Sequence, residues 1–178
     1  MDFSEILDRR HTGSMKWDNN PGPLDPEKSL IPLSVADMEF RSPRPIRNRL
    51  KELAETGIWG YTGPRPDYFE ALDRWYRIRH DFPLDPAWVV PTVGVVQAVY
   101  AAVRAFSKAG DKVLIQTPVY HPFYRAIEMN GRRLLTSPLL IRKGRYEIDL
   151  DDLETKMKEA SLFILCSPHN PVGRVWNR

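Results

Sequence analysis

The chain has 178 residues, and its 26 lysines and arginines nearly balance 23 acidic residues, leaving a net charge of +3. The arginines are scattered rather than gathered in a stripe, which argues against nucleic-acid binding. The sequence has no run of 18 apolar residues, so we expect no membrane span. The single cysteine, Cys166, excludes an intramolecular disulfide framework and fits a reducing compartment, so we expect a cytoplasmic location.

The first 45 residues form an irregular segment rich in proline and charge. We expect a short helix at 3–9 and a strand-like run at 31–36. Ser42 is a candidate N-cap for a helix that the next prolines open and that runs to about residue 55.

A glycine-rich loop at 57–64 follows and presents Trp59 and Tyr61. A second helix is expected at 67–79, where aromatic and aliphatic residues recur at helical spacing. We interpret these residues as part of the core.

From residue 88 onward the pattern changes to strands alternating with helices. Strands are expected at 88–92, 112–116, 134–135 and 162–166, with helices at 96–106, 123–130 and from Asp149 or Asp151 to 159. This order predicts an α/β fold with a mostly parallel sheet, right-handed crossovers and flanking helices.

Two segments at the expected ends of strands could hold a ligand. Gly94, between a strand and a helix, would let the backbone approach an anion such as phosphate at the free N–H groups, although any such turn can contain glycine. In Thr117-Pro118-Val119-Tyr120, prolines stiffen a loop whose tyrosine either stacks on a flat cofactor or packs under its own loop. We interpret His121 as a loop histidine.

Two further loops carry unusual residues. The loop around Tyr61 is either a ligand contact or a surface turn. The turn from Ser167 to Gly173 holds Asn170 between prolines, and an amide there can hold a phenolate oxygen but cannot titrate. We expect no metal site, because the four histidines are far apart in sequence and no cysteine pair exists.

Taken together, these segments resemble the pyridoxal-phosphate-dependent fold type I (class I/II aminotransferase) superfamily, and its cystathionine β-lyase-like carbon–sulfur lyase branch in particular. The resemblance covers essentially the whole chain. It implies a small-domain segment at 1–45 and part of a cofactor-binding large domain at 46–178. The phrases that carry it are SVADMEF at 34–40, WGY at 59–61, TPVY at 117–120 and PHNPVGRVW at 168–176.

The resemblance also implies a role for each matching residue toward pyridoxal 5'-phosphate. The N–H groups of Val95 and Val96, after Gly94, would bind the phosphate. Tyr120 would stack on the pyridine ring, and Asn170 would donate a hydrogen bond to the phenolic oxygen.

Other implied roles involve a second subunit and the substrate. Tyr61 would reach the cofactor phosphate of a neighbouring subunit, so the resemblance implies a homodimer. Ala36 and Asp37 would lie near the substrate entrance. Thr117–Pro118 and Asn170–Pro171 are candidates for cis peptide bonds.

The activity implied is β-elimination from a small amino acid, either cystathionine or a cysteine conjugate, to thiol, pyruvate and ammonia. None of the eight lysines has the family's lysine context, and we expect the Schiff-base lysine beyond Arg178. The chain by itself is therefore expected to be a catalytically inactive N-terminal part of such an enzyme. An aminotransferase of the same fold and a non-catalytic regulatory or binding subunit remain alternatives.

Overall fold

The computed structural model describes residues 3–5, 7–18 and 32–177. These residues form two compact units, an N-terminal unit at Met1–Gly63 and a C-terminal unit at Pro64–Arg178. The expected division at residue 45 refers to the domains of a larger enzyme and stays a prediction. Among the described residues, no helix is both long and apolar enough to cross a lipid bilayer.

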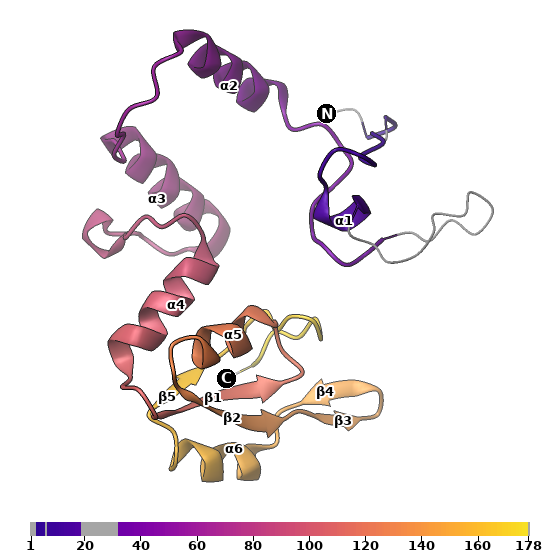
Figure 1. The fold of residues 1–178 in the computed structure, drawn as a ribbon, viewed down its shortest axis with the longest axis vertical. Helices are drawn as coiled ribbons and strands as arrows, with labels where there is room; N and C mark the ends of the chain where they lie inside the picture. The colour runs from indigo at the N-terminus through magenta and orange to yellow at the C-terminus, as the bar shows by residue number, and fades with distance from the viewer. Residues whose placement is uncertain (1–2, 6, 19–31, 178) are drawn as a thin grey trace, which may run out of the picture. The chain divides into compact units, whose positions relative to one another are not determined.

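The described part of the N-terminal unit contains two helices, α1 at Met15–Asp18 and α2 at Arg44–Thr56 (Figure 1). The predicted helix up to about residue 55 is confirmed, but Pro43 rather than Ser42 occupies the N-cap. The helix ends at Gly57, whose φ of 64° is favourable for glycine and whose N–H bonds the Ala54 carbonyl.

The predicted helix at 3–9 is wrong, because the described part of that segment is not helical. The Leu7 N–H instead donates to the Glu39 carbonyl at 3.1 Å, so the backbone bonds a distant segment rather than its own turn. The strand expected at 31–36 is also wrong where the structure describes it, at 32–36; Ile31 lies outside the described residues.

The C-terminal unit begins with α3 at Pro66–His80, a short 3-10 turn at Pro86–Trp88, and α4 at Val95–Phe106. The two predicted helices are confirmed. The predicted strand at 88–92 is wrong. A strand needs a hydrogen-bonded neighbour, and none of the described strands pairs with these residues.

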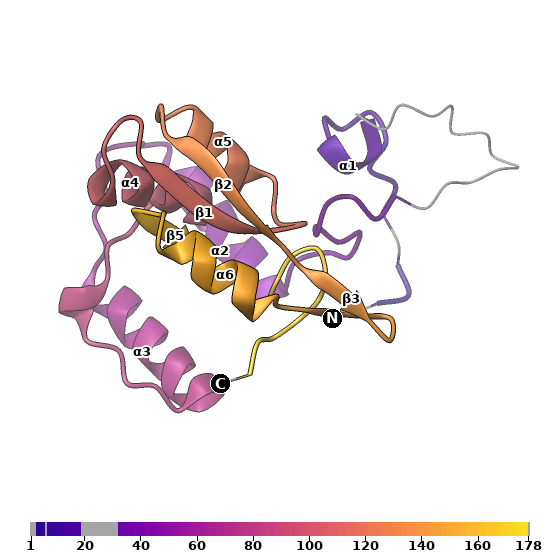
Figure 2. The ribbon, with the colours of Figure 1, turned by 90° about the horizontal axis from the view of Figure 1, so that it is seen from below.

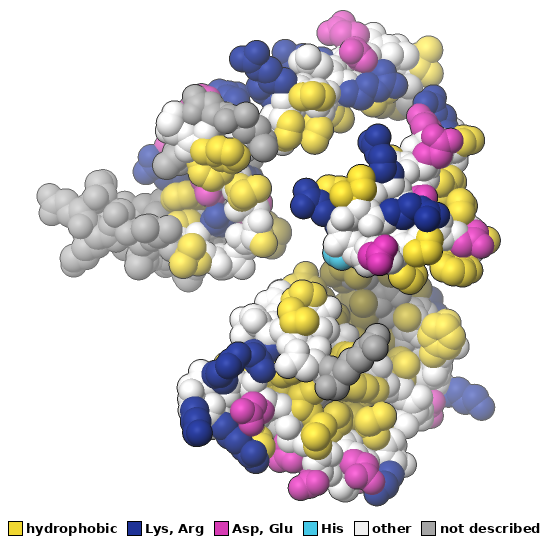
Figure 3. Space-filling view, turned by 180° about the vertical axis from the view of Figure 1, so that it is seen from behind, with side chains coloured by type: hydrophobic (Ala, Val, Ile, Leu, Met, Phe, Trp, Pro, Cys, Tyr) yellow, Lys and Arg dark blue, Asp and Glu magenta, His cyan; other side chains and the backbone are white. Residues whose placement is uncertain are grey.

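The interpretation of the α3 aromatics as core is wrong for this chain, because no α3 residue is buried. Trp75 is 55% and Ile78 73% exposed, while Tyr76 makes a ring contact with Phe82. Phe69 and Leu72 are only half-buried, so the segment around Phe82 covers the apolar side of the helix in part. Hydrophobic side chains are visible on the surface in the space-filling view (Figure 3).

The sheet of the C-terminal unit has three parallel strands in the order β2-β1-β5. They are β1 at Lys112–Thr117, β2 at Arg133–Pro138 and β5 at Leu162–Ile164. Helices α5 at Pro122–Glu128 and α6 at Leu150–Met157 lie on opposite sides of it (Figures 1 and 2). The predicted α/β class with a parallel sheet and flanking helices is confirmed.

The core forms around the central strand. In β1, Val113 to Gln116 are all buried, as expected for a parallel strand covered on both faces. Val113 and Ile115 pack with Val119 and Ile127, and Cys166 lies half-buried against this cluster. The core therefore lies directly beneath the loops that follow β1 and β5.

A two-stranded hairpin, which the sequence analysis missed, follows β2. Strands β3 at Leu140–Arg142 and β4 at Arg145–Glu147 pair antiparallel. The two residues that join them, Lys143 and Gly144, have φ values of 50° and 73°. This is the geometry of a tight hairpin turn, and the Lys-Gly pair was the available signal.

Candidate functional site

The carboxyl edge of the sheet brings two of the predicted loops together. Strands β1 and β5 are parallel neighbours, with Ile115 opposite Ile164, so the loops that follow them leave from the same edge. One loop carries Tyr120 and the other carries Asn170. Open α/β sheets bind their ligands at this edge.

A buried histidine joins the two loops. His169 is 1% exposed, and its Nε2 lies 2.9 Å from the carbonyl oxygen of Pro118. No sequence motif predicted this residue as part of the site. Its position between a serine-proline and an asparagine-proline pair was the only signal, and it does not reveal a contact 51 residues away.

The loop after β5 is closed by its own hydrogen bonds. The indole Nε1 of Trp176 donates to the Cys166 carbonyl at 2.9 Å, and the Asn170 N–H donates to the Cys166 Sγ at 3.4 Å. Gly173, at a φ of 67°, donates its N–H to the His169 carbonyl at 2.8 Å. The loop is thus fixed at both ends, and it presents Asn170 at the surface.

Three peptide bonds in these loops are cis. Thr117–Pro118 and Asn170–Pro171 confirm the prediction, and Ser167–Pro168 is a third that the sequence analysis missed.

Tyr120 is half-buried and packs within its own loop. Its ring lies edge-on to Phe123, with centroids 5.9 Å apart, and contacts the neighbouring His121 ring at 5.6 Å. It also packs against the core cluster below. The geometry is therefore compatible with both predicted roles of Tyr120, packing within its loop and stacking on a flat cofactor, because a ring that packs on the core with one face can expose the other. His121 occupies the N-cap of α5 and is exposed.

The N-terminus of α4 has the properties of an anion site. The first bond of the helix joins the Ala98 N–H to the Gly94 carbonyl at 3.3 Å, so the preceding N–H groups, those of Val95, Val96 and Gln97, have no acceptor within the helix. No acidic residue lies in the first turn. These free donors, together with the helix dipole, favour a phosphate.

Gly94 itself is extended, with φ 172° and ψ 165°, and a Cβ built on it would meet nothing within 4 Å. The backbone conformation therefore does not require glycine at this position. No hydrogen bond or ring contact among the described residues joins the α4 N-terminus to Tyr120 or Asn170.

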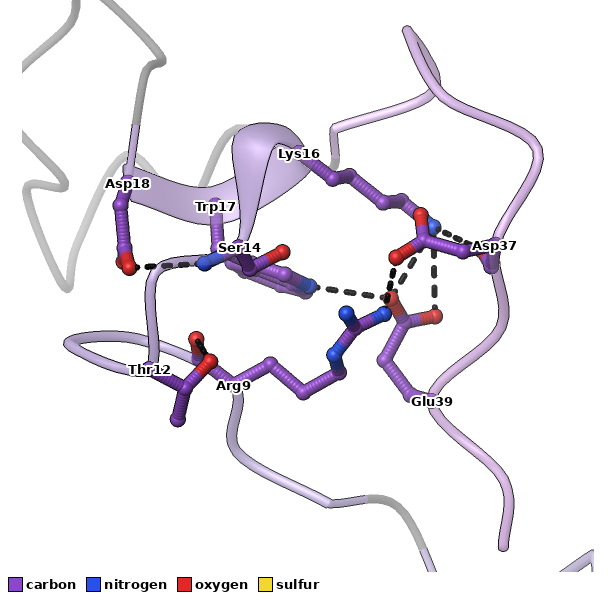
Figure 4. A network of polar contacts seen from close by, with 8 residues as sticks. All are labelled: Arg9, Thr12, Ser14, Lys16, Trp17, Asp18, Asp37 and Glu39. Carbon is purple, nitrogen blue, oxygen red and sulfur yellow. Dashed lines mark hydrogen bonds and ion pairs between the residues drawn. The ribbon is translucent and has the colours of Figure 1, made fainter. Parts of the chain in front are cut away.

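The remaining predicted site residues lie in the N-terminal unit. Tyr61 is fully exposed on its loop, and Ala36 is also exposed. Asp37 forms an ion pair with Arg9, and its backbone carbonyl accepts a hydrogen bond from the Lys16 Nζ at 2.9 Å (Figure 4).

This contact belongs to a network that the sequence analysis missed. Lys16 is buried and pairs with Glu39 at 3.0 Å, and the Trp17 indole donates to the same carboxylate at 2.9 Å (Figure 4). The hydrogen bond from Trp17, and then that from Lys16, hold the pKa of Glu39 below its ordinary value. The partners lie more than 20 residues apart, so no local pattern reveals them.

Comparison with known proteins agrees with this fold. The model of the family described as aminotransferase class I and II matches residues 28–178. The chain is 46% identical to the cystathionine β-lyase PatB of Bacillus subtilis, over 100% of the chain and 46% of that protein.

Among the solved structures that are similar over 99% of the chain are two pyridoxal-phosphate-containing proteins. One is cystalysin from Treponema denticola, whose crystal structure contains pyridoxal 5'-phosphate; the TM-score is 0.87, the identity 41%, and 46% of that chain is covered. The other is a pyridoxal-phosphate-bound C–S lyase from Staphylococcus hominis, with a TM-score of 0.86, 35% identity and 45% coverage. The chain thus spans about half the length of the relatives that it matches. On the extent of the family match, the chain belongs to the class I and II aminotransferase family.

Proposed function

We propose that this chain supplies the cofactor-binding part of a pyridoxal-phosphate-dependent carbon–sulfur β-lyase. One observation carries the proposal: His169 ties the loop of Tyr120 to the loop of Asn170 at the carboxyl edge of the sheet. The lyases among the similar proteins support carbon–sulfur chemistry. When bound, the cofactor supplies an electron sink for the carbanion formed at the substrate Cα.

The residues present fit each chemical part of this cofactor. The unpaired N–H groups at the start of α4 suit the phosphate, since no carboxylate of the first turn opposes it. The exposed Asn170 amide would donate to the phenolic oxygen, and the half-buried Tyr120 ring would offer a flat face to the pyridine ring. Among the described residues, the Asn170 side chain has no other hydrogen-bond partner.

The same proposal includes a homodimer and a substrate entrance. Tyr61 of one subunit would contact the cofactor phosphate of the other, which fits its full exposure here. Ala36 and Asp37 would line the substrate entrance, where the ion pair with Arg9 keeps the Asp37 carboxylate fixed. We propose a cytoplasmic location for the assembled enzyme.

Cofactor binding by the chain tests the proposal directly. Titration with pyridoxal 5'-phosphate, followed by tryptophan fluorescence, should saturate. N170D should weaken binding by ~10-fold, because a carboxylate repels the phenolate and cannot donate, whereas N170Q retains the donor and should weaken it less. Absence of saturable binding, or equal affinities for N170D and N170Q, would refute the site.

The reaction class needs a separate test. The chain alone should release no pyruvate from cystathionine, since none of its lysines has the expected sequence context. A longer polypeptide that joins this chain to the Schiff-base lysine should release pyruvate. Amino-group transfer to an added 2-oxo acid without pyruvate release would favour the aminotransferase alternative. Cofactor binding with neither activity would favour a non-catalytic subunit.

A further inference from the structure

His169 is the one buried histidine among the described residues. Its Nε2 lies 2.9 Å from the Pro118 carbonyl oxygen. A carbonyl oxygen can only accept, so Nε2 must carry the hydrogen and donate it. Pro118 stands two residues before Tyr120, and His169 stands directly before Asn170.

The histidine is held on its own loop from several directions. The backbone N–H of His169 donates to the Arg174 carbonyl at 2.6 Å, and the backbone carbonyl of His169 accepts from the Gly173 N–H. Its ring lies edge-on to Trp176, with centroids 5.3 Å apart and an interplanar angle of 80°. The Arg174 Nε also donates to the Tyr146 carbonyl at 3.1 Å, which ties this loop to β4. A donor fixed this firmly can define where its acceptor lies.

We propose that His169 is a positioning residue that sets the spacing between Tyr120 and Asn170, and thereby the geometry of the cofactor ring between them. The inference rests on the proposed function, but the link between the loops exists without it. Because His169 is 1% exposed, its side chain would act on a bound cofactor through the two loops rather than by touching it. Binding groups must be held to within about half an ångström, so a single rigid link between two loops matters.

Two substitutions separate the hydrogen bond from the packing. H169F keeps an aromatic ring against Trp176 and removes the donor to Pro118. H169Q loses the ring but carries a side-chain N–H at about the reach of Nε2. The other ring nitrogen, Nδ1, is buried without a hydrogen-bond partner among the described residues, so neither variant removes a bond there.

Amide hydrogen exchange of the full chain tests the link without any cofactor. H169F should accelerate exchange of the amides at 119–121 and 123 by ~10-fold and leave those of β2 unchanged, while exchange in H169Q should be closer to that of the original chain. If these loop amides exchange in H169F at the same rate as in the original chain, the proposal is overturned. A loss of protection that extends to β2 would also overturn it, because His169 would then support the core rather than the link.

Titration with pyridoxal 5'-phosphate then tests the consequence. The dissociation constant should rise ~10-fold in H169F and be largely restored in H169Q, together with the circular dichroism of the bound cofactor. If the unsubstituted chain binds no cofactor, the proposed function fails, and the exchange experiment still decides whether His169 links the loops. Faster exchange in H169F with unchanged cofactor affinity would refute the role in ring geometry.

Discussion

Replacing Gly94 with aspartate separates the stability of α4 from its capacity to bind phosphate. Gly94 is the N-cap of the helix and is extended, and a Cβ there meets nothing within 4 Å. Aspartate and asparagine are both better N-caps than glycine. G94D and G94N should therefore both fold. G94N should stabilise the chain by a few tenths of a kcal/mol, and G94D, whose charge also favours the helix dipole, by up to about 1 kcal/mol.

The two variants should differ sharply in phosphate binding. The neighbours Val93 and Val95 are 97% and 73% exposed, so charges at this helix end interact through a water-like medium. There a carboxylate and a doubly charged phosphate about 5 Å apart repel by about 2 kcal/mol. That repulsion corresponds to ~30-fold weaker binding for G94D than for G94N. The side chains of both variants accept a hydrogen bond from a backbone N–H group of the first turn. G94N therefore serves as the control for the loss of that N–H group as a phosphate donor.

The assay compares pyridoxal 5'-phosphate with pyridoxal, which lacks the phosphate. G94D should weaken binding of the phosphorylated form relative to G94N and leave their affinities for pyridoxal equal. Urea denaturation checks that both variants are at least as stable as the original chain. Equal affinities of G94D and G94N for pyridoxal 5'-phosphate would show that the α4 N-terminus is not the phosphate site.

Two further predictions concern stability. The pKa of Glu39 is lowered by Trp17 and Lys16, so the stabilisation by its charge is complete above the ordinary pKa of 4.5 and is lost as the pH falls through the lowered value. E39Q should therefore unfold at a lower temperature than the original chain at pH 7, and a difference that persists unchanged at pH 2 would contradict this reasoning. L114A should lower the free energy of unfolding, measured in urea, by about 2–5 kcal/mol, because Leu114 is fully buried in β1. L150A, at a residue that is 71% exposed, should change it by less than about 0.5 kcal/mol. Similar losses in the two variants would show that Leu114 does not belong to the core.

The strands and helices that follow local pattern were predictable from the sequence. Strand β1 was expected within one residue, since the apolar run Val113 to Ile115 between a lysine and a threonine-proline pair is typical of a central parallel strand. Helix α4 was expected from its amphipathic spacing, and α6 from a cap at Asp149 or Asp151. Asp149 is the cap, and its carboxylate accepts the Asp152 N–H. Each of these signals is contained within a few neighbouring residues.

Errors occurred where a segment depends on a partner distant in sequence. The run at 88–92 has the composition of a strand but pairs with no described strand, and the segment at 3–9 gives the Leu7 N–H to Glu39 instead of forming a helix. Backbone groups bond whatever partner the tertiary structure supplies, and composition does not name that partner.

In the candidate site too, the residue types could be predicted from the sequence, but the contacts between distant segments could not. The sequence by itself determined the family and proposed Gly94, Tyr120 and Asn170 as cofactor residues, because these lie in short motifs of neighbouring residues. Only the tertiary structure decided that the loops of Tyr120 and Asn170 meet, since this follows from the pairing of β1 with β5 and from a hydrogen bond across 51 residues. Local chemistry can be read along the chain, whereas the contact of His169 with Pro118 exists only once the strands have paired.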